Sequence, residues 1–272
     1  MKLLNGVELV GFIKERQAKQ VRSLKQANDI SPRLAIIRTN PDPVVDSYMR
    51  LKQNYGEDVG IEVDIYTIEQ PLAAATIEKL NKDSSIHGII VQIPLPDKSQ
   101  TDTILNTVST SKDVDGLAVG SKFDPATPVA INWLLAGYNI ELRGKKLVIV
   151  GNGRLVGKPL AKIWKNSSLD VTVVDKKTKN LEEITRQADV LVCATGKPGL
   201  ITDDMVKSTV VIVDAGVATD TNGLTGDVAP GVRGLADITI TPEKGGVGPL
   251  TVSALFDNVI RSARNTIKTK PQ

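Results

Sequence analysis

The amino-acid sequence predicts an α/β protein built on mostly parallel, doubly wound sheets. Short runs of Val, Ile and Leu alternate with longer amphipathic segments in β-α-β-α-β order, which is typical of a parallel sheet with helical crossovers. Phe, Trp and Tyr together make only 3% of the 272 residues, so aliphatic side chains carry the core. This composition suits a buried parallel sheet better than a single-stranded nucleic-acid binder, which relies on aromatic stacking.

The first part of the chain opens with an amphipathic segment in which apolar residues recur at helical spacing. The first strand then ends at the turn cluster 40–43, Asn-Pro-Asp-Pro, which can continue neither a helix nor a strand. The elements expected here are a helix over 7–28, a strand over 33–39, a helix over 45–59, a strand over 62–68, a helix over 73–80 and a strand over 88–94.

A second α/β unit begins after residues 143–145, where the apolar pattern restarts. The elements expected here are a helix around 130–136, a strand over 146–150, a helix over 159–165, a strand over 171–175, a helix over 181–188, strands over 189–195 and 209–217, and a last helix over 251–268. The Gly-rich loop 244–249 precedes that last helix, which we expect to return to the first domain. We therefore predict one domain from residues 1–128 and 250–272, and another from 129–249.

Charge and rare residues exclude several functional classes. Lys and Arg number 34 against 31 Asp and Glu, and a net charge of +3 argues for neither a nucleic-acid nor a membrane partner. The single cysteine, Cys193, cannot form an intramolecular disulfide, which favours a reducing, cytoplasmic location. The single histidine, His87, leaves no His-rich metal site, so we expect no metal and an acid/base group among Lys, Asp, Glu and Tyr.

A glycine-rich turn follows the strand at 146–150 and opens a helix. Gly151, Gly153 and Gly157 have the spacing G-x-G-x-x-x-G, a variant of the dinucleotide-binding fingerprint. Glycines at this point let backbone N–H groups approach a pyrophosphate at the helix N-terminus, where the helix dipole favours anions. The alternative is a tight turn that binds no ligand.

The end of the next strand bears on the choice of dinucleotide. Asp175 is placed to accept hydrogen bonds from an adenosine ribose, which favours NAD over NADP. Lys176, Lys177 and Arg154 compete with that interpretation, because each could pair with a 2′-phosphate. These residues could equally be a turn-forming carboxylate and solvated surface charges.

A second group of polar residues indicates proton-transfer chemistry. Tyr48 and Lys52 are separated by one helical turn, and a lysine partly desolvated beside a phenol can become a proton carrier. Gln92 lies near the carboxyl end of a buried strand, where ligands of open α/β sheets bind, and Asp113 and Asp115 lie in the following loop. Each has an ordinary structural explanation, but their occurrence together is harder to dismiss.

Taken in order, these segments resemble the bifunctional methylenetetrahydrofolate dehydrogenase/methenyltetrahydrofolate cyclohydrolase family. The segments that carry the resemblance are the Tyr48–Lys52 helix, GIIVQIPLP, KDVDG, the P-x-T-P of 125–128, GKPLA, ADVLVCATGKP, GDV at 226–228 and GGVGPLT. The resemblance implies oxidation of 5,10-methylenetetrahydrofolate with NAD or NADP, followed by hydrolysis of the methenyl product to 10-formyltetrahydrofolate, in one-carbon metabolism and purine biosynthesis. The alternatives are a monofunctional dehydrogenase and a non-catalytic cofactor-binding relative.

The resemblance also implies roles for single residues. Lys52 would be the acid/base and water-activating group, Tyr48 would stack on the folate, Gln92 would tune Lys52, and Asp115 would hold the pterin. Gly248, Pro249 and Leu250 would line the junction of folate and nicotinamide. The residues expected to bind the cofactor in the Rossmann-type domain are Gly151, Asn152, Gly153, Arg154, Val156, Gly157, Asp175, Lys176, Lys177, Thr195 and Gly196. Family members are usually homodimers, so a homodimer is implied.

The chain also departs from the family pattern. Gly151-Asn152-Gly153 stands where the family usually has Gly-Arg-Ser, and Asp175-Lys176 stands where it often has His-Ser. The family's Arg and Ser at the turn commonly serve the NADP 2′-phosphate, and both changes weaken an NADP assignment. The sequence favours NAD slightly, because a carboxylate would repel that phosphate whereas the lysines can swing away. Further departures that bear on substrate affinity are Val45, Ala126, Ala130, Glu243 and Lys244.

Overall fold

The computed structural model describes residues 1–220 and 223–267, and its chain forms two compact units. The three-stranded unit comprises Gly11–Ala126 and the C-terminal residues from Val252. The six-stranded unit comprises Met1–Val10 and Thr127–Thr251. Residues 1–10 thus group with the six-stranded unit, whereas the sequence analysis assigns them to the first domain. The physical reason is a short strand, β1 (Lys2–Leu3), which pairs with the sheet of the six-stranded unit.

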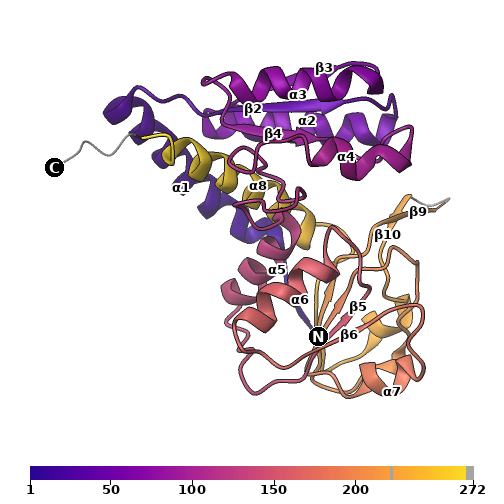
Figure 1. Cartoon of the computed structure of the whole chain (residues 1–272). Helices are drawn as coiled ribbons and strands as arrows, with labels where there is room; N and C mark the ends of the chain where they lie inside the picture. The colour runs from indigo at the N-terminus through magenta and orange to yellow at the C-terminus, as the bar shows by residue number, and fades with distance from the viewer. Residues whose placement is uncertain (221–222, 268–272) are drawn as a thin grey trace. The chain divides into compact units, whose positions relative to one another are not determined.

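The sheet of the three-stranded unit is parallel and has the order β3-β2-β4 (Figure 1). Its strands are β2 (Arg33–Arg38), β3 (Glu62–Thr67) and β4 (Gly88–Val91). The helices of this part of the chain are α1 (Gly6–Asn28), α2 (Pro43–Val59), α3 (Ala73–Lys82) and the short α4 (Thr101–Leu105), which the sequence analysis does not predict. Because the chain passes from β3 across β2 to β4, the strand order switches between β2 and β4.

Aliphatic side chains from β2, β4, α3 and α4 form one core of this unit. Residues such as Ile37, Ile77 and Ile89 are fully buried there. Each fully buried aliphatic side chain stabilises the fold by about 1.5–3 kcal/mol relative to an exposed one. Elsewhere in the unit α2 contacts β3 closely, since a Cβ on Gly56 would lie 2.7 Å from Cγ2 of Val63.

The six-stranded sheet is also parallel and has the order β1-β11-β8-β7-β5-β6. Its remaining strands are β5 (Leu147–Val150), β6 (Val171–Val174), β7 (Val190–Cys193), β8 (Val211–Asp214) and β11 (Thr239–Ile240), and β9 (Ala218–Asp220) pairs with β10 (Gly223–Thr225) in a separate hairpin. The helices are α5 (Ala126–Gly137), α6 (Gly157–Asn166) and α7 (Leu181–Arg186). The strand order switches between β5 and β7.

The predicted α/β architecture, with its parallel sheets and Rossmann-like second unit, is confirmed. Four short strands in the described part of the chain are not predicted from the sequence: β1, β9, β10 and β11. The helices α5 and α6 lie side by side, where Trp164 Nε1 donates a 2.7 Å hydrogen bond to Asn132 Oδ1 (Figure 1). Cys193 is fully buried in β7, as expected for a strand residue.

The last helix begins earlier than predicted. Helix α8 spans Val247–Arg264, so Gly248, Pro249 and Leu250 form its first turn rather than a loop before it. A proline fits this turn because the first N–H groups of a helix need no intrahelical partner. The predicted helix end at Lys268 lies outside the described residues. None of the described helices combines the length and the apolar character that crossing a membrane requires.

Candidate functional site

Lys52 and Gln92 meet in the three-stranded unit. Lys52 lies near the middle of α2, and its Nζ donates a 2.8 Å hydrogen bond to Oε1 of Gln92. Gln92 directly follows β4, and its backbone N–H donates to Ile37 O at 2.9 Å, which extends the pairing with β2. The Gln92 side chain therefore lies at the carboxyl end of β4, beside the point where the strand order switches. Ligands of open α/β sheets bind at such a point.

Burial and charge set the protonation of this site. Burial lowers the pKa of Lys52, and the nearby Asp115 carboxylate partly opposes that shift. Burial raises the pKa of Asp115; the Lys52 ammonium opposes this shift, and Asp113 reinforces it. Burial thus disfavours the charged form of each group, and the charge of each opposes that effect on the other. Among the residues that the structure describes, no group of three or more His, Cys, Asp or Glu side chains is arranged to hold a metal ion.

The loop that carries Asp115 is fixed by two anchors. The buried carboxylate of Asp113 accepts a 2.8 Å hydrogen bond from Ala118 N, which closes the loop on itself. Asn258 of α8, only 2% exposed, donates from Nδ2 to Val114 O at 2.9 Å and to Asp124 O at 3.0 Å. Asn258 is not among the predicted site residues, because no local sequence pattern links an amide in a C-terminal helix to this loop.

Tyr48 precedes Lys52 by one turn of α2, and its side chain is 37% exposed. The predicted i, i+4 relation on one helix is therefore present. Helix α2 is itself anchored one turn later, where Tyr55 Oη donates a 2.8 Å hydrogen bond to Gln17 Oε1. Gln17 is fully buried and donates from Nε2 to Ser253 O at 2.9 Å, so a single amide joins α1, α2 and α8.

The glycine-rich turn of the six-stranded unit leaves no room for side chains at two positions. Gly151 has φ +108°, and a Cβ there would lie 2.5 Å from Ala194 O. A Cβ on Gly157 would lie 1.8 Å from Gly151 O. The turn therefore joins the carboxyl ends of β5 and β7 closely, at the point where the strand order switches. Such a turn lets a ligand approach the backbone.

The N-terminus of α6 suits an anion. Its N-cap residue is Val156, and no side chain caps the helix. The preceding residues Asn152, Gly153 and Arg154 are exposed. Lys158 N donates to Gly153 O at 3.0 Å and Pro159 has no N–H, so the helix start attracts a phosphate mainly through the helix dipole and the exposed backbone of the preceding turn.

Asp175 lies at the carboxyl end of β6, as the sequence predicts. Its Oδ1 accepts a 2.8 Å hydrogen bond from Lys177 N, and its own N–H donates to Thr178 Oγ1 at 3.0 Å. Asp175, Lys176 and Lys177 are all exposed. This turn places a carboxylate and two lysines close together at the strand end.

Thr195 and Gly196 follow β7, in the loop that contacts the Gly151 turn. The backbone N–H of Thr195 donates to Asp227 Oδ2 at 2.6 Å, and Lys197 N donates to Asp227 Oδ1 at 2.9 Å. Asp227 lies in the GDV segment, which the sequence analysis uses for the resemblance without assigning it a role. Gly248 is exposed, Pro249 half-buried and Leu250 fully buried, and all three belong to the six-stranded unit. Their predicted grouping with Lys52 stays a prediction.

Comparison with protein families now decides the assignment. Residues 4–115 match the model of the tetrahydrofolate dehydrogenase/cyclohydrolase catalytic domain, and residues 125–267 match the model of the NAD(P)-binding domain of the same family. The chain belongs to the tetrahydrofolate dehydrogenase/cyclohydrolase family. The resemblance seen in the sequence is thereby confirmed, and a nicotinamide dinucleotide is the cofactor of this family's second domain.

Individual members of the tetrahydrofolate dehydrogenase/cyclohydrolase family match over nearly the whole chain. The bifunctional protein FolD of Lactobacillus acidophilus is 38% identical over 277 residues, which cover 97% of each chain. The crystal structure of the bifunctional enzyme FolD from Campylobacter jejuni has a TM-score of 0.93 at 38% identity and covers 98% of this chain and 100% of that one. The Trypanosoma brucei enzyme, solved with NADP and an inhibitor, has a TM-score of 0.91 at 26% identity, with 98% of each chain covered.

Proposed function

We propose that this protein oxidises 5,10-methylenetetrahydrofolate to the 5,10-methenyl form with a nicotinamide dinucleotide and then hydrolyses that product to 10-formyltetrahydrofolate. Membership of the family supports both activities. The observation that carries the proposal is the half-buried Lys52, whose Nζ is held 2.8 Å from Gln92 Oε1 beside Asp115. This site supplies a proton carrier without histidine or metal.

The dinucleotide fits the glycine-rich turn of the six-stranded unit. A Cβ on Gly151 or Gly157 would clash with the chain's own backbone, whereas a Cβ on Gly153 would meet nothing within 4 Å, so the turn is tight and leaves open space at Gly153 for a pyrophosphate. The residues that would hold the cofactor are Gly151, Asn152, Gly153, Arg154, Val156 and Gly157 of the turn, together with Asp175, Lys176, Lys177, Thr195 and Gly196. The dinucleotide, when bound, accepts the hydride from the methylene carbon.

In the hydrolytic step, Lys52 acts as the base. Its lowered pKa leaves part of the amine neutral, and a neutral amine can accept a proton from a water molecule as the water oxygen bonds to the methenyl carbon. The hydroxyl of this adduct then loses its proton to solvent, the C=O bond of the formyl group forms as the bond from that carbon to N5 of the folate breaks, and N5 takes up the proton held by Lys52. The formyl group stays on N10, and one proton is released overall. Lys52 thus removes a proton from water and returns one to the leaving nitrogen.

Three neighbours of Lys52 have supporting roles. Gln92 orients Nζ, because both the ammonium and the neutral amine can donate the 2.8 Å hydrogen bond. Tyr48, exposed one turn away on α2, stacks on the folate ring. Asp115 binds the pterin edge, whose adjacent N–H donors match the two oxygens of a carboxylate.

For the cofactor, the chain's own residues favour NAD over NADP. Asp175 is fixed at the end of β6 by its turn, and its charge would repel a 2′-phosphate, while the exposed Lys176, Lys177 and Arg154 work in the opposite sense. Steady-state oxidation of methylenetetrahydrofolate with NAD and NADP side by side tests this preference. We expect a larger kcat/KM with NAD, and a larger value with NADP would contradict the preference.

The proposal also covers the division of the chain and its oligomeric state. Residues 1–128 and 250–272 bind the folate and carry the chemistry, and residues 129–249 bind the cofactor. The protein also forms a homodimer through the cofactor-binding part, as the family resemblance suggests. Light scattering on the purified protein tests the dimer, and a monomer at micromolar concentration would contradict it.

The two activities are separated by one assay. We follow methenyltetrahydrofolate and reduced cofactor independently in the same reaction, starting from methylenetetrahydrofolate. We expect reduced cofactor to form while methenyltetrahydrofolate stays low. The alternative is a monofunctional dehydrogenase, which Val45 and Ala126 favour because they replace polar residues of the family pattern. Accumulation of the methenyl form without hydrolysis would support that alternative and contradict the cyclohydrolase half of the proposal.

A further inference from the structure

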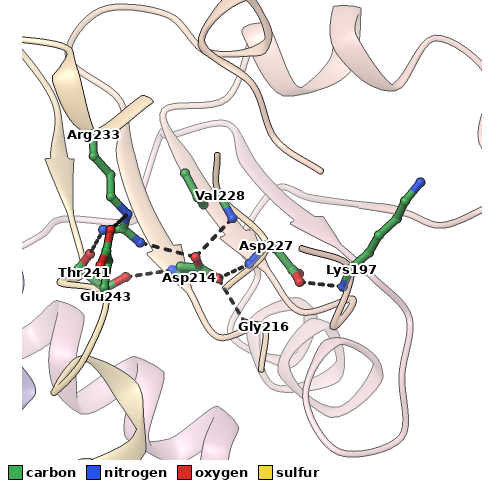
Figure 2. Close-up of polar contacts among 8 residues, drawn as sticks. All are labelled: Lys197, Asp214, Gly216, Asp227, Val228, Arg233, Thr241 and Glu243. Atoms are coloured by element: carbon green, nitrogen blue, oxygen red, sulfur yellow. Dashed lines mark hydrogen bonds and ion pairs between the residues drawn. The ribbon is translucent and has the colours of Figure 1, made fainter. Parts of the chain in front are cut away.

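Two aspartates of the six-stranded unit lie close together in its interior: Asp227 is fully buried, and the side chain of Asp214 is 4% exposed (Figure 2). Asp214 ends β8, and Asp227 lies on the loop after β10. A Cβ on Gly216, near Asp214, would lie 2.1 Å from Asp227 Oδ1. A Cβ on Gly226, next to Asp227, would lie 2.1 Å from Asp214 Oδ2. Each carboxylate therefore occupies the space that a glycine on the opposite segment leaves free.

Asp214 holds the backbone on both sides of this contact. Its Oδ1 accepts from Gly216 N at 3.2 Å and from Asp227 N at 3.0 Å, and its Oδ2 accepts from Val228 N at 3.1 Å. Arg233 forms an ion pair with Oδ2 at 3.4 Å. Its Nη1 donates to Thr241 O at 2.7 Å, so Arg233 is itself fixed (Figure 2). Asp214 thus sets the position of Asp227.

Asp227 in turn fixes the exposed loop Thr195–Lys197 from its buried side. Its side chain is fully buried, and its two oxygens accept from Thr195 N and Lys197 N, at 2.6 and 2.9 Å. Thr195 and Lys197 are exposed, so the N–H groups of a surface loop point inward to a buried carboxylate. Hydrogen bonds to an ionised group are stronger than those to a neutral one, which makes Asp227 an effective anchor.

The anchored loop lies against the glycine-rich turn. A Cβ on Gly151 would be 3.2 Å from Thr195 Cγ2 and 2.5 Å from Ala194 O, so the turn and the loop are tightly packed against each other. Both follow adjacent strands, β5 and β7, at the place where the strand order switches. A shift of residues 195–197 would therefore change the surface that the glycine-rich turn presents.

We propose that Asp227 is a positioning residue for the nicotinamide dinucleotide: its carboxylate fixes the backbone of Thr195–Lys197, and Asp214 and Arg233 hold Asp227 in place. The proposal rests on the proposed function only for the identity of the ligand. Asp227 acts through the loop and its buried carboxylate does not itself contact the cofactor. Methenyl hydrolysis needs no dinucleotide, so the two activities respond differently when this anchor is lost.

Asp227→Asn tests the proposal in the full-length protein. The substitution keeps the size of the side chain but replaces one carboxylate oxygen by an NH₂ group. An NH₂ group cannot accept a hydrogen bond from a backbone N–H, so one of the two anchoring bonds is lost. We expect NADH and NADPH, titrated by their fluorescence, to bind about tenfold more weakly, as for loss of one hydrogen bond to a charged group. Hydrogen exchange at the Thr195 and Lys197 amides should become faster, and methenyl hydrolysis without nucleotide should be unchanged.

Asp204→Asn is the matched control. Asp204 belongs to the same unit, its exposed carboxylate accepts from Thr202 Oγ1, and its substitution should leave binding and exchange unchanged. Unchanged nucleotide affinity and unchanged exchange in Asp227→Asn would overturn the proposal. An equal loss of hydrolysis would also overturn it, because it would mean that Asp227 only supports the fold.

Two further outcomes keep the test decisive. If Asp227→Asn does not fold, Arg233→Gln replaces it in the test, because this variant removes the charged partner of Asp214. Arg233→Gln should weaken nucleotide binding and leave hydrolysis unchanged, and any other result would overturn the proposal. If the wild-type protein does not oxidise methylenetetrahydrofolate, the proposed function fails. The nucleotide titration and the exchange measurement still test the role of Asp227 in that case.

Discussion

Lys52 Nζ donates a hydrogen bond to the side-chain oxygen of Gln92, while the side-chain nitrogen of Gln92 donates to the backbone carbonyl of the next residue, Ile93. Gln92 Nε2 donates to Ile93 O at 3.1 Å, which turns Oε1 toward Lys52 Nζ at 2.8 Å. The amide orientation is thus fixed by the neighbouring carbonyl. A lysine held in this way needs no positive charge to keep its place, so its amine can lose and regain a proton without moving.

The pH dependence of hydrolysis follows from this arrangement. Burial lowers the pKa of Lys52 below the ordinary 10.5, and the hydrolytic step needs the neutral amine. The rate of enzymic methenyl hydrolysis should therefore rise with pH as Lys52 loses its proton, with an apparent pKa below 10.5. The measurement is the initial rate of methenyl absorbance loss, corrected at each pH for the spontaneous reaction. A corrected rate that falls with rising pH would contradict the role of Lys52 as a base.

Gln92→Glu should shift that profile to higher pH. A carboxylate at the position of the amide would favour the Lys52 ammonium and raise its pKa, so less neutral amine would be present at neutral pH. We expect a lower rate at pH 7 that recovers as the pH rises. Gln26→Glu, on the exposed surface of α1, is the control and should leave the profile in place. A loss that is the same at every pH would mean that Gln92 only positions the amine.

Lys52→Met should abolish hydrolysis and leave the protein folded. Loss of a general base typically lowers a rate about 10²- to 10⁴-fold. The methionine fits a half-buried place without the cost of desolvating a charge, so the urea midpoint should stay equal or rise. Lys19→Met, which removes an exposed lysine paired with Glu15, is the control for charge alone. Hydrolysis at the wild-type rate in Lys52→Met would rule out the assigned role.

Tyr55→Phe should destabilise the three-stranded unit. The hydroxyl of Tyr55 donates to Gln17 Oε1 inside the protein, and burial raises the pKa of Tyr55 to about 12. Removing the hydroxyl leaves a buried acceptor without this donor, which costs about 1–3 kcal/mol of unfolding free energy. Urea denaturation measures the loss. Tyr66→Phe in β3 is the control, and an equal loss there would show that the Gln17 contact has no special importance.

Gly157→Ala should remove nucleotide binding and spare hydrolysis. The new Cβ would lie 1.8 Å from Gly151 O, so the turn between β5 and α6 must open to admit it. Gly234→Ala in the same unit is the control, because a Cβ there meets nothing within 4 Å and Gly234 is not among the residues proposed to hold the cofactor. NADH fluorescence titration should give binding for Gly234→Ala and none for Gly157→Ala. Equal affinities would contradict the assignment of this turn to the cofactor.

The sequence predicts features whose signal is local. The Tyr48–Lys52 spacing, the polar Gln92 at a strand end and the glycine-rich turn each depend on a few consecutive residues, and the structure contains all three. The position of Gln92 is predictable because the carboxyl end of a buried parallel strand is a general ligand position.

Features built from distant segments could not be predicted. Asn258 reaches Val114 from a different part of the chain, and nothing in the helix pattern distinguishes this amide from a surface one. Asp214 and Asp227 look like ordinary turn residues until folding brings each opposite a glycine. Strands of two residues, such as β1 and β11, are too short to show any periodicity.

The pairing of β1 with β11 has a consequence for how the protein is made. Lys2 and Leu3 pair with Thr239 and Ile240, so β1 cannot join the six-stranded sheet until β11 has been synthesised. Contacts between such distant residues slow folding, because a long loop must close first. A fragment that starts at Thr127 would lack β1 and expose β11 as an open sheet edge, on which a strand of another chain could pair.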